Sequence, residues 1–242
     1  MPSDTVDILA FGAHADDVEL SCGGTLAWAV RQGQTVGIVD LTRAEMGTRG
    51  TPEIRLRESK VASRILKAQF RIRLDFGDGA LRTGREEELE LIRIIRKHRP
   101  SIVIGPYTED RHPDHARAGR LITEASFYAG LARIETGDRA HRPQAVIYHM
   151  LTYTETPSFV VDITSTFATK MKAIRAYASQ FYNPKSKEKE TILSQKSFLD
   201  RIEGRARYFG SLIGAEYGEP FWTKEPPKVT DLVAAYSGRE VS

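Results

Sequence analysis

The chain has 242 residues, a length that corresponds to one large domain or two small ones, and we expect a single domain over residues 1–242. Hydrophobic residues make up 40% of the sequence and charged residues 28%, which is typical of a globular protein and excludes a disordered or collagen-like chain. The 35 basic and 32 acidic residues are interspersed along the chain. Nucleic acid is therefore not expected as a partner.

The single cysteine, Cys22, excludes an internal disulfide and a thiolate zinc cluster, so a bound metal would need histidine and carboxylate ligands. The apolar stretches are interrupted well before the ~20 residues that a membrane helix needs. The N-terminal stretch MPSDTVDILAFG lacks the basic flank and cleavage site of a signal peptide. We therefore expect a cytoplasmic protein without a membrane partner.

Short apolar runs alternate with helix-like segments through the first half of the chain. The expected strands are 6–12, 35–41, 70–76 and 101–105, and the helices that follow them are 17–31, 52–67, 86–98 and 114–131. Strands separated by helices of this length form right-handed βαβ units. The pattern predicts an α/β fold with a Rossmann-like open, mostly parallel sheet, strand order 3-2-1-4, and helices on both faces.

The second half of the chain is expected to complete this domain. Further strands are predicted at 145–151 and 159–163, and helices near 165–182 and 188–210. Pro220, Pro226 and Pro227 cannot continue a helix. We therefore expect residues 220–242 to form an extension that wraps the surface or a neighbouring subunit.

Two polar clusters follow the first and fourth expected strands. The first is AHADD at 13–17 and the second is DRHPDH at 110–115. In open α/β sheets, ligands bind beyond the carboxyl ends of the strands where the winding direction reverses, which here is between these two strands. His14 and Asp17 are three residues apart, as are the two histidines of the second cluster, so each pair can face one centre.

Two imidazoles, one carboxylate and an open position are typical of a catalytic zinc site, although iron, nickel or cobalt accept a similar set. Bound zinc lowers the pKa of its water to about 7, so a carboxylate that is not a ligand can accept a proton from that water. A structural interpretation is also open: Asp16, Asp17 or Asp114 could cap the helix that follows it.

Together the two motifs resemble the paired signature of the PIG-L/LmbE-like N-deacetylases, zinc enzymes that remove acetyl from N-acetylglucosamine attached to another group. The resemblance covers about residues 6–220, and Ala15 stands where many members have proline. The roles that it implies are binding of one zinc ion by His14, Asp17 and His115, general-base catalysis by Asp16, oxyanion stabilisation by a protonated His112, and orientation of a histidine by Asp114.

Within this family the stretches DILAFGAHADDVEL, VGIVDLTRAEMGTRGT, PYTEDRHPDH and RAYASQF look most like those of the bacillithiol-biosynthesis deacetylases. The resemblance implies N-acetylglucosaminyl L-malate as substrate. Guanidinium groups bind carboxylates in a bidentate manner, so Arg55 and Arg111 are candidates for binding the malate. Residues 42–50 could fold over the sugar. The resemblance also implies a homo-oligomer, commonly a hexamer.

Other functions stay open at this point. The substrate could be another N-acetylglucosamine conjugate, such as a chitooligosaccharide or N-acetylglucosaminyl inositol. Asp110 or Asp114 could instead complete a two-metal phosphoesterase site, in which the ions lie about 3.5–4 Å apart. A non-catalytic sugar-binding protein would keep the fold but need no unbound aspartate.

Overall fold

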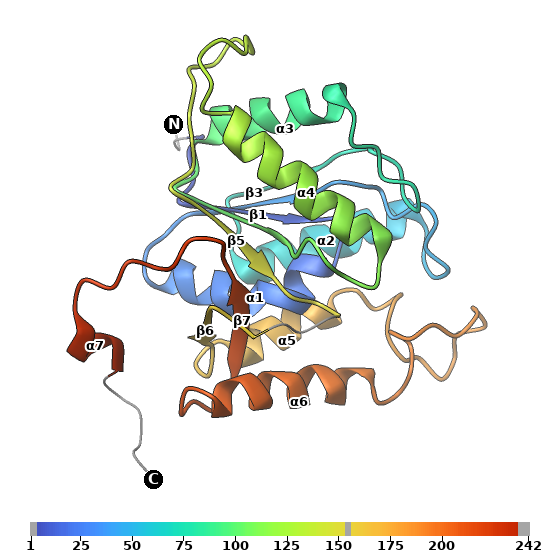
Figure 1. Ribbon diagram of the computed structural model, residues 1–242. Helices are drawn as coiled ribbons and strands as arrows, with labels where there is room; N and C mark the ends of the chain where they lie inside the picture. The colour runs from blue at the N-terminus through green and yellow to red at the C-terminus, as the bar shows by residue number, and fades with distance from the viewer. Residues whose placement is uncertain (1–3, 153–155, 237–242) are drawn as a thin grey trace.

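The computed structural model describes residues 4–152 and 156–236, and its centre is a 7-stranded sheet in the order β3-β2-β1-β4-β5-β7-β6 (Figure 1). The strands are β1 (Ile8–Gly12), β2 (Val36–Asp40), β3 (Phe70–Arg73), β4 (Ile102–Pro106), β5 (Ala145–His149), β6 (Phe159–Asp162) and β7 (Gly218–Trp222). The first five pair in parallel, which confirms the predicted order 3-2-1-4. β7 runs antiparallel to both of its neighbours, β5 and β6.

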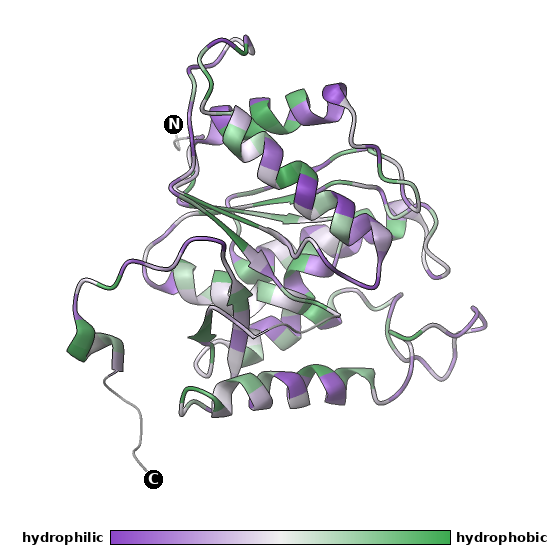
Figure 2. Cartoon of the chain, viewed as in Figure 1, coloured by the Kyte–Doolittle hydropathy of each residue, from purple (hydrophilic) through white to green (hydrophobic). Residues whose placement is uncertain are grey.

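Helices cover both faces of the sheet, as predicted. They are α1 (Asp17–Arg31), α2 (Pro52–Leu66), α3 (Arg85–His98), α4 (Pro113–Tyr128), α5 (Phe167–Arg175), α6 (Phe198–Ser211) and the short α7 (Leu232–Tyr236). One apolar core joins α1, α2, α5 and α6 to the sheet, and a second joins α3 and α4 to the opposite face. Figure 2 shows the matching pattern, with apolar colour concentrated on the strands and polar colour on the outer sides of the helices. No helix in the described ranges is long and apolar enough to cross a membrane.

The helix predicted at 188–210 is shorter than expected, because α6 begins only at Phe198. Side chains before it bind the backbone instead: Ser194 Oγ accepts a hydrogen bond from Thr191 N at 2.8 Å, and Thr191 Oγ1 accepts one from Ser194 N at 3.3 Å. Such local bonds compete with helical hydrogen bonding. They account for the turns that replace the first part of the predicted helix.

The extension predicted over 220–242 also starts later than expected, because residues 220–222 belong to β7, where Pro220 lies opposite Val160. The chain leaves the sheet only after Trp222 and runs outward to α7 (Figure 1), and residues 237–242 lie outside the described ranges.

β7 is held by Glu219, whose buried carboxylate accepts hydrogen bonds from the N–H groups of Gly24 and Thr25 at 3.0 and 2.6 Å. Lys170 Nζ, 2.5 Å from Glu219 Oε1, completes this buried pair between α5 and the sheet.

A glycine sets how closely α4 approaches the end of β4. A Cβ atom on Gly119 would lie 2.4 Å from the carbonyl oxygen of Pro106 and 3.3 Å from the backbone of Thr108. Only a hydrogen atom fits between these backbones. The close contact positions the first turn of α4, which carries the second polar cluster.

We expect Gly119→Ala to lower the free energy of unfolding by about 1–3 kcal/mol, because backbone atoms on both sides have to move apart. Urea denaturation measures the change. Gly204→Ala in α6 is the matched control: nothing lies within 4 Å of the added Cβ, so this variant should gain about 0.5–1 kcal/mol from its better helix propensity. Equal stability of Gly119→Ala and the wild type would contradict the packing described for α4.

Candidate metal and catalytic site

The two polar clusters meet at the carboxyl edge of the sheet, as the strand order predicts. Residues 13–17 leave β1 and enter α1, and residues 110–115 leave β4 and enter α4. His112 caps α4, because its Nδ1 accepts a hydrogen bond from Asp114 N at 3.2 Å, and Pro113 occupies the first helical position. Two segments far apart in the chain therefore share one site.

His14, Asp17 and His115 have the geometry of metal ligands. Asp17 Oδ2 lies 3.6 Å from His14 Nδ1, and Asp17 Oδ1 lies 3.4 Å from His115 Nε2. One possible ligand atom from each residue lies within 4.8 Å of the others. A tetrahedral zinc site with bonds of about 2.0–2.1 Å separates its ligand atoms by about 3.4 Å. The three predicted ligands therefore fit one small divalent ion.

Two further carboxylates orient the histidines of this triad. Asp110 Oδ1 accepts from His115 Nδ1 at 3.0 Å, and Asp78 Oδ1 accepts from His14 Nε2 at 2.9 Å. Each contact leaves the other ring nitrogen directed to Asp17. Carboxylate partners of this kind fix the tautomer and strengthen the histidine as a ligand.

The ionisation of these groups reflects a concentration of buried negative charge. Burial alone would lower the pKa of His115, but Asp17 and Asp110 raise it to about 9. Burial would raise the pKa of Asp17, but His115 and His14 hold it well below its ordinary value. The carboxylates keep their negative charge at this site, and a metal ion that binds there would displace the protons of the imidazoles.

His112 lies beside the triad, with its ring 4.8 Å from the rings of both His14 and His115. Burial, followed by the charges of these two histidines, lowers its pKa. Its Nδ1 accepts the Asp114 N–H, so that nitrogen cannot carry a proton. This corrects the expectation of a protonated His112: the ring is a neutral imidazole with its proton on Nε2, which still provides one donor.

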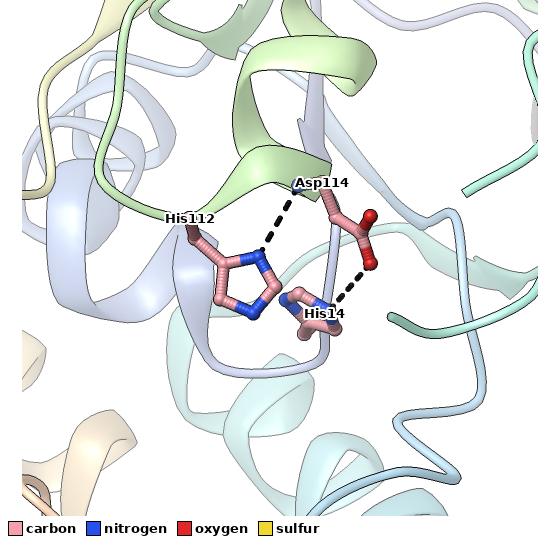
Figure 3. Close-up of side chains that lie close together, drawn as sticks. All are labelled: His14, His112 and Asp114. Carbon is pink, nitrogen blue, oxygen red and sulfur yellow. Dashed lines mark hydrogen bonds and ion pairs between the residues drawn. The ribbon is translucent and has the colours of Figure 1, made fainter. Parts of the chain in front are cut away.

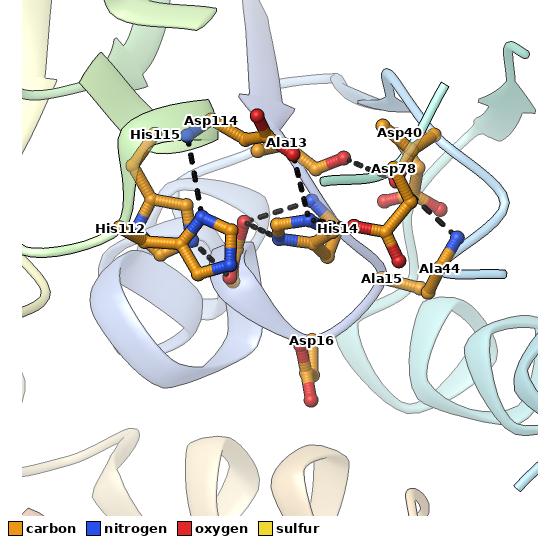
Figure 4. A network of polar contacts seen from close by, with 12 residues as sticks. Ala13, His14, Ala15, Asp16, Asp40, Ala44, Asp78, His112, Asp114 and His115 are labelled. Carbon is orange, nitrogen blue, oxygen red and sulfur yellow. Dashed lines mark hydrogen bonds and ion pairs between the residues drawn. The ribbon is translucent and has the colours of Figure 1, made fainter. Parts of the chain in front are cut away.

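Asp16 has a positive φ of 107°, a backbone conformation that costs a residue with a side chain about 1–3 kcal/mol. Its Oδ2 lies 3.1 Å from Nη2 of Arg55, and Figure 4 shows the carboxylate pointing away from the histidines. Burial raises the pKa of Asp16 to about 7, against the opposing charge of Arg55. Arg55 also donates to the carbonyl oxygen of Ala15. Arg55 also lines the cavity, so a substrate carboxylate that binds it would share it with Asp16.

Asp114 is engaged with the backbone. Its two oxygens accept the N–H groups of Gly79 at 2.7 Å and Leu81 at 3.1 Å, while its Oδ2 is 3.8 Å from His14 Nε2. The histidine orientation expected of Asp114 therefore falls mainly to Asp78. His14, His112 and Asp114 also form a second possible metal-binding group (Figure 3). A second ion there would have to share His14, whose Nδ1 faces Asp17, and compete with Asp78 for its Nε2, so the geometry favours a single metal.

A cavity of about 840 Å³ opens over these residues. Ligand sites commonly have volumes of about 300–1,000 Å³. The exposed Arg111 lines the cavity, and so do four residues of the 42–50 loop. These loop residues are Ala44, Met46, Gly47 and Thr48.

Asp78 and Asp110 are the residues whose roles the sequence reasoning missed. Asp110 belongs to the quoted motif but was considered only as a ligand to a second metal. Asp78 follows β3, so the rule that placed the other clusters at strand ends could have found it. Little in the sequence points to this role of Asp78, because no histidine lies near Asp78 in the sequence.

Comparison with known families agrees with this site. The family model PIG-L, described as GlcNAc-PI de-N-acetylase, matches residues 9–126, which contain both clusters. The diacetylchitobiose deacetylase of Thermococcus kodakarensis is 33% identical over 232 residues, which cover 90% of this chain and 82% of the relative. The chain therefore belongs to the PIG-L/LmbE-like family of deacetylases that act on N-acetylglucosamine conjugates.

Two solved structures have the same fold. A conserved protein of Thermus thermophilus is 37% identical with a TM-score of 0.86, and the match covers 94% of this chain and 99% of that one. The N,N'-diacetylchitobiose deacetylase of Pyrococcus horikoshii, solved with an inhibitor, is 27% identical with a TM-score of 0.80 and coverage of 93% and 86%. Both likenesses extend over nearly the whole described chain.

We expect Asp110→Asn to weaken zinc binding about 10–100-fold, because the neutral amide no longer orients and polarises His115. Competition between the protein and a chromophoric chelator measures the zinc affinity. Asp75→Asn is the control, since the Asp75 side chain is 65% exposed and pairs only with Arg43 in the ion pairs of the described chain. Unchanged zinc affinity in Asp110→Asn would show that the contact to His115 does not support metal binding.

Proposed function

We propose that this protein is a zinc-dependent hydrolase that removes the acetyl group from an N-acetylglucosamine conjugate. The observation that carries the proposal is the convergence of His14, Asp17 and His115 on one ion-sized centre at the floor of a cavity. Asp16 and His112 line the same cavity, so an acid–base group and a hydrogen-bond donor stand beside that centre. Family membership supports the reaction type.

Zinc bound by the triad would polarise the acetyl carbonyl and lower the pKa of a water molecule. His112 has Nε2–H free to donate to the carbonyl oxygen as negative charge develops there, since its Nδ1 is occupied by Asp114 N. A neutral imidazole is sufficient for this role. Each group thus acts on one atom of the acetamide.

Asp16 is the proposed general base. It accepts a proton from the attacking water as the water oxygen bonds to the carbonyl carbon, and it passes that proton to the nitrogen when the C–N bond breaks. The products are acetate and a free amine. Because the carboxylate points toward Arg55 in this structure, the role requires a side-chain rotation toward the triad.

For the substrate we propose N-acetylglucosaminyl L-malate. The support is the resemblance of the motif-bearing stretches and the exposed Arg111 at the cavity. Arg55, the second residue proposed for malate binding, also lines the cavity, where it pairs with Asp16. The two relatives named for diacetylchitobiose favour a chitooligosaccharide as the alternative substrate.

The decisive experiment incubates zinc-loaded protein with N-acetylglucosaminyl L-malate, diacetylchitobiose, N-acetylglucosaminyl inositol and free N-acetylglucosamine, and measures acetate release. We expect release to require the metal and to be fastest with the malate conjugate. Faster release from diacetylchitobiose would replace the malate assignment but keep the deacetylase. Absence of release from every compound would contradict the proposed function.

We expect Asp16→Asn to lower kcat about 10²–10⁴-fold, the usual contribution of a general acid–base group. The variant should still bind one zinc ion per chain, because Asp16 is not a ligand in the proposed site. Steady-state kinetics and metal analysis of the same preparation test both statements. Full activity in Asp16→Asn would remove Asp16 from the mechanism, and loss of zinc would make it a ligand.

A further inference from the structure

One wall of the cavity is a single face of α6. The α6 residues that line it are Phe198, Arg201, Ile202 and Arg205. Spacings of three, one and three residues place all of them on one side of a helix. The wall therefore carries the apolar side chains of Phe198 and Ile202 and the guanidinium groups of two arginines. Arg111 adds a third guanidinium group to the cavity lining.

None of these three arginines forms an ion pair within residues 4–152 and 156–236. Arg201 Nη2 donates to the amide oxygen of Gln195 at 2.6 Å, and Arg205 Nη2 donates to the carbonyl oxygen of Met150 at 2.7 Å. Both acceptors are neutral. Arg207 on the same helix differs, because it pairs with Glu203 at 2.9 Å and Glu216 at 3.3 Å.

Within the described residues no carboxylate pairs with Arg205, whose guanidinium carbon lies 5.0 Å from the centre of the Phe209 ring. The residue is half-buried, and burial lowers the pKa of its guanidinium, with Asp110 as the opposing acid. Asp110 is itself shared among His115, His112 N and Thr152 N. A partly desolvated cation without a committed partner favours an incoming anion.

The acids that line the cavity do not neutralise this wall. Asp16 pairs with Arg55, while Asp17 and Asp78 pair with the histidines of the triad. The cavity thus has a floor that suits a cation and a wall that suits an anion.

We propose that Arg205 and Arg201, with Arg111, recognise an acidic substituent of the conjugate, a carboxylate or a phosphate, while its acetamide lies at the triad. The proposal rests on the proposed function, and in it the acidic group of the substrate binds to the arginines of the α6 wall. Guanidinium groups match both anions, because their planar donors bind two oxygens at once. The neutral atoms that Arg201 and Arg205 now contact leave further N–H donors for this purpose.

The test compares kcat/KM of the zinc-loaded enzyme for two anionic compounds and one neutral compound. N-acetylglucosaminyl L-malate supplies carboxylates, N-acetylglucosamine 1-phosphate supplies a phosphate, and diacetylchitobiose carries no charge. We expect Arg205→Gln to lower the anionic-to-neutral ratio of kcat/KM at least about tenfold, because the neutral amide loses a charge-assisted hydrogen bond to the anion. Arg205→Lys should recover part of that ratio, and the compound with the larger ratio identifies the anion.

Arg207→Gln is the matched control on α6, and its ratio should equal that of the wild type. Equal losses of Arg205→Gln on all three compounds would overturn the proposal and place Arg205 at the acetamide or in a structural role. Unchanged ratios in both Arg205→Gln and Arg201→Gln would overturn it as well.

Calorimetric binding of L-malate to the zinc-loaded protein separates this proposal from the proposed function. If no conjugate releases acetate, the proposed function fails, but weaker malate binding in Arg205→Gln than in Arg207→Gln still supports the anion site. Equal malate binding in the two variants would reject the site independently of catalysis.

Discussion

The active centre depends on one buried carboxylate, Asp17, which faces histidines from two distant parts of the chain. His14 lies on its own turn, and His115 comes from α4, beyond β4. A buried carboxylate is unfavourable unless positive charge or donors surround it. The negative charge of Asp17 therefore stabilises the contact between the segment after β1 and the segment after β4. For the same reason it favours the binding of a cation between them.

The surrounding contacts fix the positions of the two histidines around Asp17. Gly119 lets α4 approach the end of β4 to backbone contact, and this places His115 at its distance from Asp17. Asp110 and Asp78 then hold the far side of each imidazole. Because these positions are determined by packed backbone and buried acids, the ligands are oriented before any ion binds, which reduces the ordering that metal binding requires.

The part of this architecture that the sequence predicts is the part built from local periodicity. β1 and β4 appear as apolar runs, right-handed crossovers make them neighbours, and strand ends then bring the two clusters together. β7 could not be predicted in this way, since the stretch from Gly218 to Trp222 contains proline and is held by Glu219. The acceptor role of Glu219 toward Gly24 spans 195 residues, a distance that no local pattern reports.

The site shows the same division between local and long-range information. Residue types and spacing predict His14, Asp17 and His115 as ligands, but the direction of a side chain is a tertiary property. Arg55 illustrates this, because nothing in its place in the sequence indicates that its buried guanidinium pairs with Asp16.

The neutral state of His112 follows from a helix cap that fixes its Nδ1 as an acceptor, and this constrains how the cavity can work. With His112 neutral, the positive charge of the cavity lies at the triad centre when a metal is bound and along the α6 arginines. A substrate with a neutral acetamide at one end and an acid at the other would match both regions simultaneously. The reverse orientation would place an acid on the metal and an acetamide against guanidinium groups that have no ion pair among the described residues, which leaves their charge uncompensated. With the proposed anion site on α6, the separation of charge between floor and wall would select the orientation of the conjugate as well as its chemical class.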